Sequence, residues 1–159
     1  MSYQLEEEML EHLKSHLKGR VVILGIGNTL RSDDGAGSLL ANRLQGNTPF
    51  TVWDTGTCPE NYLNRIIKDK PDTIVIIDAA DFGGLPGEFR VLGTDEIKTA
   101  NLFSTHNASP SLLINYLQSN LKVDIIILII QPKNIHFSNE LSPEVSHTLN
   151  VLEGFLCQG

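Results

Sequence analysis

The sequence has 159 residues, of which 41% are apolar and 19% are charged, and its formal net charge is −7. This composition is typical of a globular protein with a full core, so we expect residues 1–159 to fold as a single domain. The acidic balance and the lack of a Lys/Arg cluster exclude a nucleic-acid partner, and the longest apolar run, residues 125–130, is too short to span a membrane.

The pattern of apolar residues predicts helices and strands in alternation. Near the start, apolar side chains fall on every fourth residue and predict an amphipathic helix over residues 4–18, within an N-terminal segment 1–20 that packs on the domain. Further along, short apolar runs predict strands at residues 21–26, 50–54, 73–77, 88–92 and 124–131. Helical spacing and well-placed prolines predict helices at residues 35–44, 59–67, 109–120 and 141–156.

Strands that alternate with helices indicate an α/β fold. We expect a three-layer αβα sandwich with a mostly parallel, twisted sheet, in which the most apolar strand, residues 124–131, is central. Open sheets of this kind bind ligands in the crevice beyond the carboxyl ends of their strands. Polar residues that follow the predicted strands are therefore the first candidates for function.

The turn after the first predicted strand resembles a nucleotide-binding loop but has the wrong charge. Gly25 and Gly27 are followed by Leu30 where a dinucleotide fingerprint requires a third glycine, and no Gly-Lys-Ser/Thr sequence is present. Asp33 and Asp34 would also repel a phosphate at the start of the next helix. An α/β nucleotide-binding module is therefore the least favoured of the three functions that we consider for this chain.

Three residues near strand or helix ends are candidates for chemistry. Asp34 precedes a predicted helix and could equally be its N-cap, a role that is open to Asp33 as well. Asp78 ends a buried strand, where a charge needs a partner. His106 lies in a polar loop before a helix. Asp81 is a weaker candidate because it fits a solvated loop.

Asp34, Asp78 and His106 together form a possible metal-ligand set. Two carboxylates and one imidazole suit Zn²⁺, Ni²⁺ or Mn²⁺, and three protein ligands leave a coordination position open. A metal site formed by His12 and His16, four positions apart on the first predicted helix, is a weaker candidate. A zincin requires glutamate directly after the first histidine, and this sequence has Leu13 there. The sequence also lacks a Gly-x-Ser-x-Gly elbow and an evident base for a cysteine nucleophile.

Three motifs, in order, resemble those of the hydrogenase maturation endopeptidases. They lie at residues 25–37, 77–83 and 105–107, and the resemblance extends from about residue 21 to residue 131. The combination of Asp-Asp-Gly-Ala-Gly with Thr-His-Asn is most similar to the subgroup that serves hydrogenase-3-type enzymes. Such enzymes remove a C-terminal extension from the nickel-containing large-subunit precursor of NiFe hydrogenase.

The resemblance implies that Asp34, Asp78 and His106 contact nickel and carry out an aspartyl-type endopeptidase reaction. The nickel is carried by the precursor, and other divalent metals are expected to substitute for it. Whether the metal performs the chemistry or only positions the precursor stays open. A second group of candidates is expected at the same sheet edge: Asn28, Asp33, Asp54 and Asp81.

The expected partner is the large-subunit precursor, and a non-catalytic nickel-binding checkpoint or chaperone that uses the same ligands is the alternative hypothesis. Cys58 and Cys157 are isolated, which fits a reducing cytoplasm. We therefore expect a cytoplasmic monomer with no membrane span.

Overall fold

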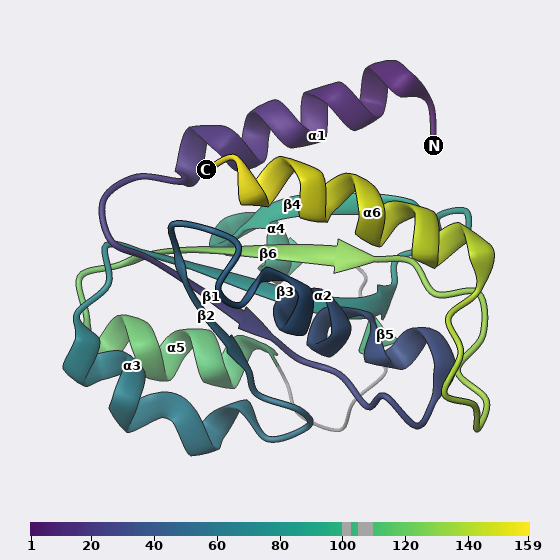
Figure 1. Cartoon of the computed structure of the whole chain (residues 1–159). Coiled ribbons are helices and arrows are strands. Elements are labelled where there is room, and N and C mark those ends of the chain that lie inside the picture. Colours follow the sequence, from purple (N-terminus) through teal and green to yellow (C-terminus); the bar gives the residue numbers. More distant parts are fainter. Residues whose placement is uncertain (100–102, 105–109) are drawn as a thin grey trace.

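The computed structural model describes residues 1–99, 103–104 and 110–159 and shows a sheet covered by helices (Figure 1). The helices are α1 (Tyr3–His16), α2 (Ala36–Leu44), α3 (Leu63–Asp69), α4 (Thr94–Thr99), α5 (Pro110–Asn120) and α6 (Pro143–Cys157), with short 3-10 helices η1 (Ser32–Gly35) and η2 (Pro59–Tyr62). The strands are β1 (Val21–Gly25), β2 (Thr51–Asp54), β3 (Thr73–Asp81), β4 (Phe89–Gly93), β5 (Phe103–Ser104) and β6 (Asp124–Ile130). In the described ranges no helix has the length and apolar character needed to cross a membrane.

The strands are arranged in the order β2-β1-β3-β6-β4. Neighbours pair in parallel except β4, which runs antiparallel to β6, and β5 adds a short antiparallel pairing at the end of β3. The expected mostly parallel sheet is thus confirmed. The central strand is β3, with the more apolar β6 beside it, because β4 turns back to pair along the outer side of β6.

Helices cover both faces of the sheet, so the expected three layers are confirmed (Figure 1). Side chains alternate along each strand. In β3, for example, Val75 and Ile77 join a core with residues of α1, α2 and α6. Ile74 and Ile76 face the opposite way and join a second core with residues of α3, α4 and α5. The two cores thus pack against opposite faces of the sheet.

Two boundaries differ from the predictions in ways that concern the site. The strand expected to end at residue 77 continues to Asp81, because β6 and β5 pair with its last residues. Asp78 therefore lies inside a strand rather than after one. The N-cap of α2 is Gly35, so the prediction of an aspartate at this cap is wrong, and η1 precedes the helix. The sequence analysis also missed α4, which is only six residues long.

Candidate functional site

Asp34 and Asp78 lie at the same edge of the sheet, beyond the end of β1. The last residue of β1, Gly25, is in register with Ile77 of β3, and the backbone N–H of Ile26 donates to the carbonyl of Ile77 over 2.9 Å. Both carboxylates are buried, with 1% of Asp34 and 7% of Asp78 exposed. The structure therefore brings two of the predicted site residues to one region of the molecule.

The close approach of α2 to this edge depends on Gly37. A Cβ atom on Gly37 would clash with the backbone carbonyls of Ile77 and Ile26. Gly27 has a similar role, because its Cβ atom would come within 2.7 Å of the carbonyl oxygen of Asp34. Glycine at these positions lets η1 and α2 pack directly on the strand ends beside Asp78.

Asp33, next to Asp34, holds the loop after β6. Its buried carboxylate accepts hydrogen bonds from the backbone N–H groups of Lys133 (2.8 Å), Asn134 (3.1 Å) and Ser142 (2.8 Å) and from the Ser142 hydroxyl (2.8 Å). These donors satisfy a buried charge that would otherwise be costly. Asp33 is thus part of the scaffold under the site.

Asp54 and Asn28 also make structural contacts. The carboxylate of Asp54, at the end of β2, accepts hydrogen bonds from the Ser38 hydroxyl, from the Asn42 amide (2.7 Å) and from the N–H of Gly56 (3.0 Å). It thereby ties α2 to β2. The Asn28 side-chain oxygen accepts from the N–H of Leu30 over 3.0 Å and shapes the turn after β1.

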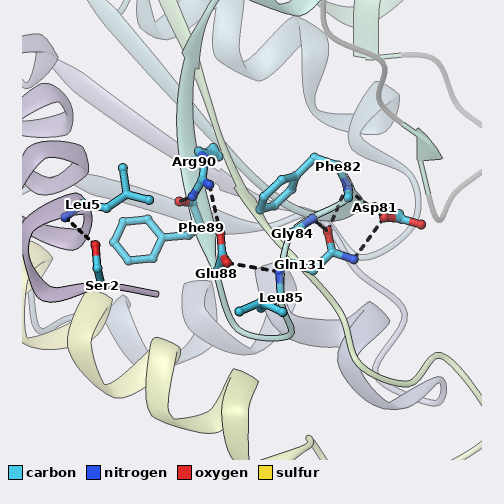
Figure 2. A network of polar contacts seen from close by, with 11 residues as sticks. Ser2, Leu5, Asp81, Phe82, Gly84, Leu85, Glu88, Phe89, Arg90 and Gln131 are labelled. Carbon is cyan, nitrogen blue, oxygen red and sulfur yellow. Dashed lines mark hydrogen bonds and ion pairs between the residues drawn. The ribbon is translucent and has the colours of Figure 1, made fainter.

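Asp81 ends β3 and contacts Gln131, which follows β6 (Figure 2). Its carboxylate accepts from the N–H of Gly83 over 2.9 Å and from the Gln131 amide over 3.1 Å. These hydrogen bonds, the one from Gly83 first, lower the pKa of Asp81. Asp81 is exposed, as the prediction of a solvated loop residue expected, although it closes a strand.

Gln131 also holds the loop between β3 and β4. Its side-chain oxygen accepts from the N–H groups of Phe82 (3.0 Å) and Gly84 (3.1 Å), as Figure 2 shows. Glu88 closes the other side of the loop through the N–H of Leu85 (3.2 Å) and the guanidinium of Arg90 (2.9 Å). The segment that follows Asp78 is therefore held by partly buried polar contacts on both sides.

His106, the third predicted ligand, lies outside the described residues. Within the described ranges, no group of three His, Cys, Asp or Glu residues is arranged to hold a metal ion. His12 and His16 lie with ring centroids 5.1 Å apart, but the Nδ1 atom of His16 pairs with Asp124 over 2.6 Å, at the other end of the sheet. The donor types of the predicted set, carboxylate and imidazole, fit Ni²⁺.

Sequence analysis missed the residues that support the site. Ser142 and Gln131 make contacts that join distant parts of the sequence, and each had a signal. Ser142 directly precedes Pro143, the usual arrangement of an N-cap before the first helical turn. Gln131 is the first polar residue after the apolar run of β6. Neither signal names the partner, which lies far away in the sequence.

Comparison with known proteins gives consistent likenesses. A family model described as hydrogenase maturation protease, HycI, matches residues 36–158. The hydrogenase 3 maturation protease of Escherichia coli is 40% identical over 123 residues, which cover 73% of this chain and 75% of that protein. The crystal structure of a NiFe hydrogenase maturation protease HycI from Thermococcus kodakarensis matches with a TM-score of 0.82 at 33% identity, covering 92% of this chain and 97% of that one. The solution structure of an endopeptidase HycI from Escherichia coli matches with a TM-score of 0.78 at 32% identity, covering 88% and 90%.

Proposed function

The chain belongs to the hydrogenase maturation protease family, and from this premise we propose that it removes the C-terminal extension from the large-subunit precursor of a NiFe hydrogenase. Membership of the family makes it a protease, that is, a hydrolase of peptide bonds. One observation supports the proposed site above others: two carboxylates, Asp34 and Asp78, are buried at one sheet edge although they are 44 positions apart.

In this proposal, Asp34, Asp78 and His106 bind the nickel that the precursor carries. Carboxylate oxygens and an imidazole nitrogen are suitable ligands for Ni²⁺. The chain reaches His106 two residues after Ser104, and Ser104 pairs with Ala80 near the end of β3. The sheet topology thus supports the placement of all three residues in one site.

The precursor's nickel has a chemical use in such a site. A divalent ion bound next to the scissile bond polarises its carbonyl or supplies a hydroxide, so a protein nucleophile is not needed. In this proposal, Asp34, Asp78 and His106 would hold the ion, and the ion would orient the carbonyl of the scissile bond. A precursor without nickel then lacks the ion that the protease binds and that activates the scissile bond. Cleavage is therefore coupled to metal insertion.

The place of action that we propose is the cytoplasm. Cys58 and Cys157 are free thiols, and Cys58 is exposed. Free thiols on a protein surface suit a reducing compartment.

The direct experiment mixes the purified protein with nickel-loaded large-subunit precursor and measures the precursor's intact mass, with nickel-free precursor alongside. We expect one loss at the C-terminus, only in the loaded sample. Asp34→Asn, Asp78→Asn and His106→Gln should each abolish this loss. Asp95→Asn, which removes an exposed carboxylate from the first turn of α4, should cleave as the wild type does.

Each further outcome has one meaning. Complex formation with loaded precursor but no loss of mass would support the alternative function, a nickel-binding checkpoint. Full cleavage by Asp34→Asn would disprove the ligand assignment. Loss of cleavage in Asp34→Asn with retained precursor binding would show that Asp34 acts in the chemical step rather than in docking.

A further inference from the structure

Two loops next to Asp34 are joined into one surface, which we call the loop platform: residues 30–32 and 134–138. Ser138 accepts from the N–H of Ser32 over 2.7 Å through its carbonyl and donates its own N–H to the carbonyl of Leu30 over 3.0 Å. The guanidinium of Arg31 donates to the carbonyl of Ile135 over 3.2 Å. Asp33 fastens the base of the second loop through Lys133 and Asn134. The position of the platform is thus fixed relative to η1.

The loop platform presents three large apolar side chains to solvent. Leu30 is 58% exposed, Ile135 37% and Phe137 83%. Arg31 and Ser138 form a parallel β-bridge, so Leu30 and Phe137, which directly precede them, occupy corresponding positions in the two loops. The hydrogen-bonded backbone of both loops keeps these side chains at the surface. An ordered apolar patch of this kind is typical of a protein-binding surface.

We infer that the loop platform binds an apolar stretch of the precursor next to the scissile bond. This inference rests on the proposed function, and it assigns the platform the role of substrate docking. Leu30 lies four positions before Asp34, and the same 3-10 helix, η1, connects the platform to that carboxylate. In this inference, a polypeptide bound at Asp34 extends onto the loop platform, which carries Leu30 and Phe137. Aromatic side chains such as Phe137 bury a large apolar area and are enriched in protein–protein interfaces.

The test compares the steady-state kinetics of the wild type with those of Phe137→Ala and Leu30→Ala, using nickel-loaded precursor. We expect KM to rise about tenfold in each variant with kcat within about twofold, because a docking residue contributes to binding rather than to the chemical step. Tyr3→Ala is the matched control. Tyr3 is 75% exposed but lies at the start of α1, so its loss should leave KM unchanged. All three side chains are exposed, and the thermal unfolding of each variant checks that folding is intact.

A binding measurement separates failure of this inference from failure of the proposed function. The Asp34→Asn protein, with and without Phe137→Ala, is titrated with loaded precursor, so that affinity is read without cleavage. Weaker binding by about tenfold in the double variant supports the platform even if the wild type does not cleave the precursor. Equal affinities, or a KM for Phe137→Ala within twofold of the wild type, would overturn it. So would a wild-type dimer that Phe137→Ala converts to a monomer with KM unchanged, because the patch would then serve self-association.

Discussion

Ser142 donates two hydrogen bonds to the carboxylate of Asp33, one from its backbone N–H and one from its hydroxyl, each 2.8 Å long. Ser142 is also the N-cap of α6, so this pair joins the start of the last helix to η1, which contains Asp34. The adjacent residues Asp33 and Asp34 therefore have different surroundings and, in our proposal, different roles. Asp33 fixes the scaffold, and Asp34 contacts the precursor's nickel.

Asp33→Asn should destabilise the protein although it conserves size. In the wild type, buried backbone N–H groups donate to both carboxylate oxygens of Asp33. In the variant, the asparagine NH2 group replaces one of these oxygens, so some of these donors lose their acceptor. We expect the free energy of unfolding to fall by about 1.5–3 kcal/mol, the contribution typical of hydrogen bonds to a charged group. Urea denaturation measures it. Asp95→Asn, on the surface, should change it by less than about 0.5 kcal/mol. A stable Asp33→Asn protein would contradict the scaffold role.

Ser142→Ala tests whether the contact with Asp33 adds to helix capping. The Ser142 hydroxyl donates to Asp33 and accepts from the N–H of Val145 over 3.3 Å. Its loss should cost about 1–2 kcal/mol, and less when Asp33 is already asparagine, so a double-mutant cycle should give a coupling energy near about 1 kcal/mol. Ser2→Ala removes the cap of α1, which accepts from Leu5, and serves as the exposed comparison. Strictly additive losses for Ser142 and Asp33 would count against the coupling.

Much of the fold follows from local sequence, but the contacts of the site do not. Apolar runs predicted β1, β2, β3, β4 and β6 and the three layers, but not the short β5, because burial of β1, β3 and β6 requires nearly every residue to be apolar. The end of β3 was predicted too early, since its last residues are held by pairing with β5 and β6 from elsewhere in the chain. The role of Asp33 was equally hidden. Its partners Lys133 and Ser142 lie 100 and 109 positions further along the sequence. The pattern of residues around Asp33 cannot indicate partners so far away in the chain.

Glu88 should make the free energy of unfolding depend on pH in the acidic range. Burial by itself raises the pKa of the Glu88 carboxyl, but hydrogen bonds from Leu85 and Arg90 and the charge of Arg90 outweigh it, so the pKa is lowered from 4.5. A lowered pKa in the folded state means that this carboxylate stabilises the protein fully above pH 4.5 and stops doing so as the pH falls through the folded value. Urea unfolding at several pH values should therefore show a shallower acid loss for Glu88→Gln than for the wild type.

The comparison for Glu88 is Glu60→Gln, which also removes one negative charge but at an exposed position. This variant controls for the change in net charge. Parallel pH profiles of the wild type and Glu88→Gln below pH 4.5 would show that the contacts with Leu85 and Arg90 do not favour the ionised form in solution.

Gly37→Ala tests whether the close packing of α2 on the strand ends positions the site. The added methyl group would overlap the carbonyl groups of Ile26 and Ile77, which are backbone atoms and cannot rotate away. The start of α2 must then move, and Asp34, two residues before its first residue, moves away from Asp78. We expect a loss of more than about 3 kcal/mol in unfolding free energy and at least a tenfold loss of precursor cleavage.

Gly154→Ala is the matched substitution, because an added Cβ atom at Gly154 meets no atom within 4 Å. Gly154 lies inside α6, where alanine is the better helix former, so this variant should gain about 0.5–1 kcal/mol and retain full cleavage. A lower unfolding free energy for Gly37→Ala together with a higher one for Gly154→Ala would show that the effect at Gly37 comes from the crowded backbone, not from the loss of a glycine. If Gly37→Ala cleaved the precursor at the wild-type rate, the distance between α2 and β3 would not control the site.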